Sequence, residues 1–67
     1  MATMHSYRAY FLSASDHIRS VTAIETTDDA SATAEAEYLL NRSDYAAVEI
    51  WDGKRMVVRA ERAQQAA

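Results

Sequence analysis

The chain has 67 residues, of which 49% are hydrophobic and 25% charged, and its formal net charge is −3. A chain of this length has room for one domain, which is marginally stable unless a disulfide, a metal or a second subunit supports it. The chain contains no cysteine and only two histidines, which excludes disulfides and the common zinc ligand sets. Association with another chain is the stabilising device that remains.

Composition also narrows the partners and the location. The negative net charge disfavours nucleic acid as a partner, because neutralisation of phosphates dominates that kind of binding. No apolar run approaches the roughly 18 residues of a membrane span, and the start lacks the charged and apolar regions of a signal peptide. We therefore expect a cytoplasmic protein that makes no membrane contact.

The first predicted elements are two strands that form a hairpin. Residues 6–12 alternate in a way that favours a strand, with Tyr10 and Leu12 on one face. Residues 13–16, "SASD", form a turn cluster, and residues 17–25 supply a second, β-branched strand. The apolar alternation slips between Ile18 and Val21, which predicts a bulge near Ser20.

A helix is predicted over residues 29–41, where alanines, glutamates and leucines replace the β-branched residues. Asp28 is the expected N-cap, because its carboxylate can accept hydrogen bonds from the first turn. Tyr38 lies roughly opposite the expected core-facing stripe. That stripe consists of Ala32, Thr33, Ala36, Leu39 and Leu40.

A second hairpin is predicted from residues 45–51 and 54–60, with Asp52 and Gly53 as its two-residue loop. Residues 61–67 have no apolar partner and are expected to be a frayed tail, so the domain would comprise residues 1–60. The predicted fold is therefore α+β, in the order β-β-α-β-β. One helix would pack on a four-stranded, mainly antiparallel sheet.

The register implied by that loop makes both faces of the second hairpin apolar. One face would carry Val48, Ile50 and Val57, with Arg55 and Arg59 nearer its rim, and the other Tyr45, Ala47, Trp51, Met56 and Val58. A single helix covers only one face, and the pattern leaves open which one. Because an uncovered apolar patch usually marks an interaction site, we expect a homodimer through the free face or a strand edge, and further contact with another protein is compatible with it. The predicted interface residues are Tyr10, Leu12, Tyr45, Trp51, Met56 and Val58.

An alternative reading makes the same hairpin a binding surface for nucleic acid or a small ligand. Trp51 could stack on a base, with Lys54, Arg55 and Arg59 supplying positive charge. The sequence pattern of sheet-based RNA binders is absent and the chain is acidic overall, so this reading ranks below self-association.

The sequence offers little support for catalytic activity. His17 follows Asp16 in a turn, but an acid–base pair also needs an orienting group and a pocket. The acidic residues at 28, 29, 35 and 37 fit a solvated helix better than a calcium loop. A single glycine excludes a glycine-rich phosphate loop. We therefore expect no enzymatic activity, no metal and no cofactor.

Three stretches resemble a family of very short, functionally uncharacterised bacterial proteins, chiefly from alphaproteobacteria. They are "YRAYFL" near the start, "DDASATAEAEYLL" in the middle and "VEIWDGKRMVVR" at the end, and the resemblance covers residues 6–59. These proteins often have a glycine in the first turn, where this chain has "SASDH". The resemblance implies a bacterial protein of unknown function and carries over no activity.

Overall fold

The computed structural model describes residues 4–62 and contains four strands and one helix. They are β1 (His5–Leu12), β2 (Ile18–Thr26), α1 (Asp29–Asn41), β3 (Ala47–Asp52) and β4 (Arg55–Glu61). The predicted β-β-α-β-β order is confirmed. Every pairing between neighbouring strands is antiparallel, and the order across the sheet is β2-β1-β3-β4. Strands β1 and β3 are therefore central, and β2 and β4 form the edges.

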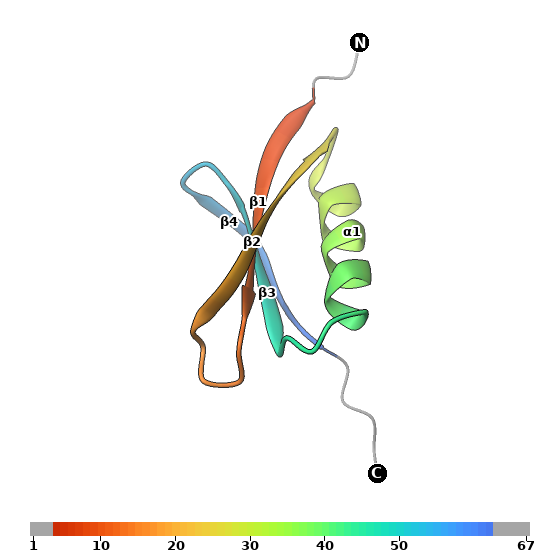
Figure 1. The fold of residues 1–67 in the computed structure, drawn as a ribbon. Helices are drawn as coiled ribbons and strands as arrows, with labels where there is room; N and C mark the ends of the chain where they lie inside the picture. The colour runs from red at the N-terminus through yellow and green to blue at the C-terminus, as the bar shows by residue number, and fades with distance from the viewer. Residues whose placement is uncertain (1–3, 63–67) are drawn as a thin grey trace.

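Figure 1 shows the sheet nearly edge-on, with α1 lying along one of its faces. The described part of the chain places no helix on the other face. That asymmetry divides the sheet into a covered face and an uncovered face, and alternate residues of each strand belong to one or the other.

The helix begins and ends where the sequence predicts. Asp28 has an extended backbone, and its side chain accepts a hydrogen bond of 2.7 Å from the backbone N–H of Ser31, as expected of an N-cap. Ala32, Ala36 and Leu40 are buried, so the predicted core-facing stripe is confirmed. Small residues at the first two of these positions let the helix approach the sheet closely.

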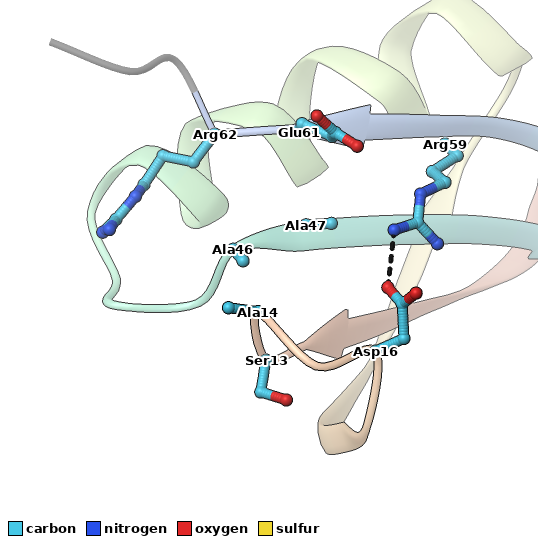
Figure 2. Close-up of a pocket in the computed structure, with 8 residues that line it drawn as sticks. All are labelled: Ser13, Ala14, Asp16, Ala46, Ala47, Arg59, Glu61 and Arg62. Atoms are coloured by element: carbon cyan, nitrogen blue, oxygen red, sulfur yellow. Dashed lines mark hydrogen bonds and ion pairs between the residues drawn. The ribbon is translucent and has the colours of Figure 1, made fainter. Parts of the chain in front are cut away.

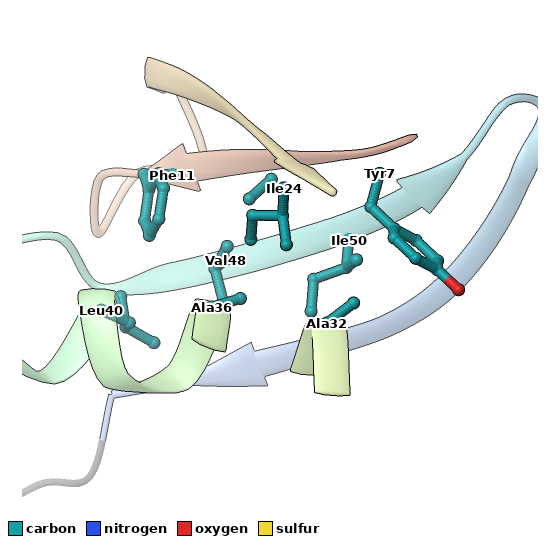
Figure 3. Packing of buried hydrophobic residues seen from close by; sticks show 9 residues of the cluster. Tyr7, Phe11, Ile24, Ala32, Ala36, Leu40, Val48 and Ile50 are labelled. Carbon is teal, nitrogen blue, oxygen red and sulfur yellow. The ribbon is translucent and has the colours of Figure 1, made fainter. Parts of the chain in front are cut away.

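Figure 3 shows the core between the helix and the covered face. Three of the four strands of the sheet, β1, β2 and β3, contribute side chains to this core. The tyrosine hydroxyl is the polar side-chain group among its members. The cluster comprises Tyr7, Ala9, Phe11, Ile24, Ala32, Ala36, Leu40, Val48 and Ile50. The helix thus covers the face that carries Phe11 and Ile50, which the sequence left undecided.

The first hairpin contains the predicted bulge. Phe11 pairs with Ser20 and Leu12 pairs with Ile18, so Arg19 is an extra residue on β2. The connection between the strands contains Asp16, whose φ of 66° is one that asparagine and aspartate tolerate better than most residues.

The turn of the second hairpin lies one residue later than predicted. Asp52 pairs with Arg55, so the two central residues are Gly53 and Lys54 rather than Asp52 and Gly53. Gly53 has a φ of 65°, whereas Lys54 is not among the residues with positive φ. Glycine at the first central position is the pattern of a type II′ turn, which joins twisted strands as readily as the type I′ turn we expected.

A bulge in β4 changes the predicted faces, which the later turn leaves unchanged. Trp51 pairs with Met56, but Ile50 pairs with Val58, which makes Val57 an extra residue. Val58 therefore lies on the covered face, and Arg59, opposite Glu49, lies on the uncovered face. The prediction placed both of these β4 residues on the opposite sides, and it was wrong because sequence alternation does not reveal the extra residue.

The end of the described chain is more ordered than expected. Glu61 is the last residue of β4, and the backbone N–H of Arg62 donates to the carbonyl of Ala46 at 2.9 Å. The predicted frayed tail is therefore wrong for these two residues. The rest of that prediction, residues 63–67, lies outside the described residues.

Candidate functional site

The uncovered face is the surface on which the chain leaves apolar side chains without a helix. Its residues follow from the pairing registers, because directly opposed residues share a face. They are Ser6, Arg8, Tyr10 and Leu12 on β1; Ile18, Val21, Ala23 and Glu25 on β2; Ala47, Glu49 and Trp51 on β3; and Met56, Arg59 and Glu61 on β4.

One end of this face is closed by the β1–β2 loop. Asp16 reaches from the loop to Arg59 of β4, where the carboxylate and guanidinium are 2.7 Å apart (Figure 2). The loop and the strand ends enclose a hollow of about 200 Å³. Ala47 lines the hollow and is only 2% exposed. We expected Leu12 to be left in water, and this is wrong: it is 4% exposed on the central strand β1, where it pairs with Ile18 and Ala47.

In the β3–β4 half of the uncovered face, the charged side chains pair with one another. Arg59 binds Glu49 at 2.9 Å in addition to Asp16, and the indole N–H of Trp51 donates to Glu49 at 3.3 Å. These two carboxylates raise the pKa of Arg59 above its ordinary value. The tryptophan is half-buried and its polar atom is satisfied, which leaves Met56, 43% exposed, as the exposed large apolar side chain of this half.

The β2 half of the uncovered face is apolar and exposed. Ile18 and Val21 are 62% and 50% exposed, although both are β-branched strand residues. Val21 lies opposite Tyr10, which is half-buried, and Ala23 is exposed beside Arg8. Most of the apolar surface that the sheet leaves exposed to solvent therefore lies at the β2 edge.

The two edge strands of the sheet also differ in how well they are protected against pairing with another chain. Strand β4 carries three charged side chains, Arg55, Arg59 and Glu61, together with its bulge, and natural sheets use both devices to discourage pairing with another chain. Strand β2 is longer and carries only Arg19 and Glu25 as charges, with its bulge close to one end. The β2 edge is the less protected of the two.

A polar network on the covered side ties the second hairpin to the helix. The hydroxyl of Tyr7 donates to Asp29 at 2.8 Å, and Arg55 donates twice to Asp29 and once to Asp52, each at 3.1 Å. Burial and the neighbouring Asp29 carboxylate raise the pKa of Tyr7 to about 12. Hydrogen bonds from Arg55 and Tyr7 hold the pKa of Asp29 below its ordinary value. All of these groups are engaged in holding the fold together.

The structure brings together four of the six residues predicted for the interface. Leu12, though buried, lies on the uncovered face together with Tyr10, Trp51 and Met56. The other two lie on the covered side.

Tyr45 packs on Phe11, with ring centroids 5.5 Å apart, and Val58 lies opposite Ile50. Ile18 and Val21 are the exposed apolar residues that sequence reasoning missed. Their β-branched character was visible, but their exposure follows from the strand order, which makes β2 an edge.

The alternative set for nucleic-acid or small-ligand binding is not gathered into one surface. Arg55 lies on the covered side, whereas Trp51 and Arg59 lie on the uncovered face. Each of these arginines is bound between two carboxylates. Lys54 is exposed in the turn. A polyanion would have to displace internal ion pairs to use these cations, so the arrangement does not favour this reading.

The other residues considered for chemistry have structural contacts. The Asp16 carboxylate binds Arg59, while Nδ1 of His17 is 3.3 Å from the hydroxyl oxygen of Ser15. Over residues 4–62, no group of three or more histidine, cysteine, aspartate or glutamate side chains is placed to hold a metal ion. In the same part of the chain, no helix is long and apolar enough to cross a membrane.

Comparison with known proteins adds no relative: no protein-family model, no curated protein and no solved structure matches the chain significantly. The functional argument therefore depends on the geometry of the sheet. Two features of that geometry stand out, which are the exposed apolar β2 half of the uncovered face and the unprotected β2 edge.

Proposed function

We propose that this protein is a small, non-enzymatic interaction module that self-associates as a homodimer through its sheet. The observation that carries the proposal is the exposure of Ile18 and Val21, 62% and 50%, on a strand at the edge of the sheet. Both belong to an uncovered face whose Tyr10 is only half-buried. A strand that holds its apolar side chains in water gains free energy when a partner removes them from it.

The size of the domain supports the same proposal. The chain has no cysteine, and its described residues 4–62 supply one helix with which to cover a four-stranded sheet. Its single core cluster lies between that helix and the covered face. Burial of the free apolar surface against a second copy adds hydrophobic stabilisation of roughly 25 cal/mol per Å² without a new sequence element. Two-fold symmetric dimers are the commonest way in which small proteins obtain it.

The proposed setting is the bacterial cytoplasm, and another protein is the natural further partner of such a module. This part of the proposal is supported by the resemblance of residues 6–59 to short bacterial proteins and by the composition of the chain. The net charge of −3 and the internally paired arginines of the second hairpin argue against nucleic acid as the partner.

Sedimentation velocity over the micromolar concentration range tests self-association. We expect the sedimentation coefficient to rise with concentration towards that of a dimer. Val21→Ser should move this rise to higher concentration, because it removes exposed apolar surface from the β2 half. Tyr38→Ser is the matched control, since Tyr38 is 57% exposed but lies on the helix. A wild-type protein that stays monomeric throughout the range contradicts the proposal.

Tryptophan fluorescence tests the alternative ligand class. Trp51 is the single tryptophan, so its emission reports on the uncovered face directly. We expect no change on titration with single-stranded oligonucleotide at low salt. A saturable change that disappears at moderate salt would favour nucleic-acid binding and would count against the proposal.

A further inference from the structure

Strand β2 offers an unpaired edge along nine residues, Ile18–Thr26. Its neighbour within the sheet is β1, and the described chain places no strand on its other side. Backbone N–H and C=O groups that point away from β1 are therefore free to pair with an added strand. Figure 1 shows β2 with α1 beside it on the covered side and no element beyond its edge.

We infer that two copies of the protein pair β2 with β2, antiparallel, around a two-fold axis that passes through Thr22. This inference rests on the proposed self-association and specifies its interface and register. The two four-stranded sheets then form one continuous eight-stranded sheet, with a helix from each copy on the same face. Main-chain hydrogen bonds supply affinity in such strand additions, and the side chains opposite each other supply specificity.

The charged residues of β2 determine the register of this pairing between two copies. In antiparallel pairing around a two-fold axis, the central residue faces itself and its neighbours face one another in reverse order. With Thr22 at the centre, Arg19 lies opposite Glu25 of the partner subunit, and symmetry repeats the pair. These two residues are the charges of β2, and both are exposed. Each would gain an opposite charge across the new strand pair.

The neighbouring registers lose this match. If Val21 is central, Arg19 lies opposite Ala23 of the partner subunit and the charges stay apart. If Ala23 is central, an apolar side chain, Val21, lies opposite the partner's Glu25. Charge complementarity therefore selects Thr22 from the registers that keep most of the strand paired.

Between Ser20 and Ile24 the same register keeps the two faces of the sheet aligned, whereas Arg19 lies in the bulge of β2. Val21 meets Ala23 of the partner subunit on the uncovered face, and Ser20 meets the partner's Ile24 on the covered side. The exposed apolar halves of the two uncovered faces then adjoin across the axis, which shields Val21 from water. The β4 edges, with their charges and bulges, remain at the two outer ends of the eight-stranded sheet.

Charge reversal tests the register. Arg19→Glu places acidic side chains opposite each other twice, and Glu25→Arg does the same with basic ones. We expect each single variant to self-associate more weakly, by up to about tenfold, since like charges directly opposite are destabilising. An equimolar mixture of the two variants should dimerise like the wild type, and so should the double variant, because both restore opposite charges. Lys54→Glu and Glu37→Arg carry the same charge changes away from β2 and should leave self-association unchanged.

A cysteine cross-link tests the position of the axis independently. The chain has no cysteine, so Thr22→Cys introduces a single thiol. Directly opposed residues of an antiparallel pair have Cα atoms about 4.5–5.5 Å apart, within the range of a disulfide. We expect Thr22→Cys to form a covalent dimer on mild oxidation. Thr26→Cys, on the same strand and the same side, should not, because the two copies of this position lie at opposite ends of the strand pair.

The outcomes separate the inference from the proposed function. If the wild type does not dimerise, self-association and its register both fail. If the wild type dimerises but the two charge reversals leave the affinity unchanged, or Thr22→Cys fails to cross-link, the register is wrong and self-association stands. Restoration in the mixture together with a cross-link at Thr22 confirms the inference.

Discussion

The covered and uncovered faces of the sheet are built from alternate residues of the same strands, but they differ in how completely they are buried. On the covered face, Val48 and Ile50 are fully buried, and the network around Asp29 satisfies its polar rim. On the uncovered face, the side chains of Ile18 and Val21 are 62% and 50% exposed. Ion pairs of Arg59 with Asp16 and Glu49 occupy the β3–β4 half of that face. Under the proposed self-association, one face sets the stability of the domain and the other sets its association.

The largest expected effect tests the first half of that statement with one substitution at two places. Ile50→Ala removes buried methyl groups beneath the helix and should lower the free energy of unfolding by about 2–5 kcal/mol. Ile18→Ala makes the same change on the uncovered face and should cost less than about 1 kcal/mol at low protein concentration. Urea unfolding of both variants measures the difference. Equal losses would show that the uncovered face is as important to the monomer as the covered one.

The next effect concerns the turn of the second hairpin, which sets the pairing of β3 with β4. Gly53 has a φ of 65°, and a Cβ atom there would meet nothing within 4 Å, so the cost of Gly53→Ala is purely conformational. We expect a loss of about 1–2 kcal/mol in urea unfolding, because left-handed backbone is unfavourable for residues with a Cβ. Lys54→Ala, at the other central position, should be nearly neutral. A neutral Gly53→Ala would mean that the turn does not hold the register described.

The smallest effects concern the polar rim of the covered face, where Asp29 and Arg55 are both about half exposed. The pKa of Asp29 is lower in the folded protein than its ordinary value of 3.8. Its contribution to stability is therefore complete above pH 3.8 and is lost as the pH falls through the folded-state value. We expect Asp29→Asn to be less stable than the wild type at neutral pH. The two urea midpoints should converge below pH 3.8, and a difference that does not depend on pH would contradict the assignment.

The alkaline side gives the opposite sign for Tyr7. Its pKa is raised from 10.0 to about 12 in the folded protein, so its contribution is complete below pH 10 and is lost between pH 10 and 12. Tyr7→Phe removes the hydroxyl that donates to Asp29 and should be less stable than the wild type at neutral pH. The difference should shrink above pH 10, as measured by urea unfolding at each pH. A constant difference would show that the hydroxyl contributes through packing rather than through its proton.

The elements with strong local signals could be predicted from sequence. Asp28 and the alanine-rich run defined the helix at both ends, and the slip between Ile18 and Val21 located the first bulge within a residue. These features depend on side chains acting on their own backbone or on near neighbours, so they are visible in a short stretch of sequence.

The register of the second hairpin could not be predicted in the same way. "DGK" supports a two-residue turn on either Asp52-Gly53 or Gly53-Lys54, and the choice moves the β4 partner of each β3 residue by two positions, which leaves the faces unchanged. The extra residue Val57 is as apolar as its neighbours, so nothing in the alternation marks it. The consequence for the candidate surface was direct, because Val58 moved under the helix and Arg59 moved to the uncovered face.

The candidate surface also depended on contacts between distant residues. Asp16 and Arg59 are 43 positions apart, and their ion pair joins the β1–β2 loop to β4. Likewise, the exposure of Val21 follows from the position of β2 at the edge of the sheet. The need for a partner stays a prediction, and the strand order decides which part of the sheet it would involve.

The central seam between β1 and β3 has a consequence for the folding pathway. The β1–β2 and β3–β4 pairings are local hairpins, whereas the seam from Arg8–Trp51 to Leu12–Ala47 joins strands separated by β2 and the helix. Closing the loop between them costs chain entropy before any contact across the seam forms. We therefore expect the two hairpins to form early and the seam to close in the rate-limiting step. In stopped-flow refolding, Ala9→Gly at the seam should slow folding, and Gly53→Ala at the outer turn should mainly speed unfolding.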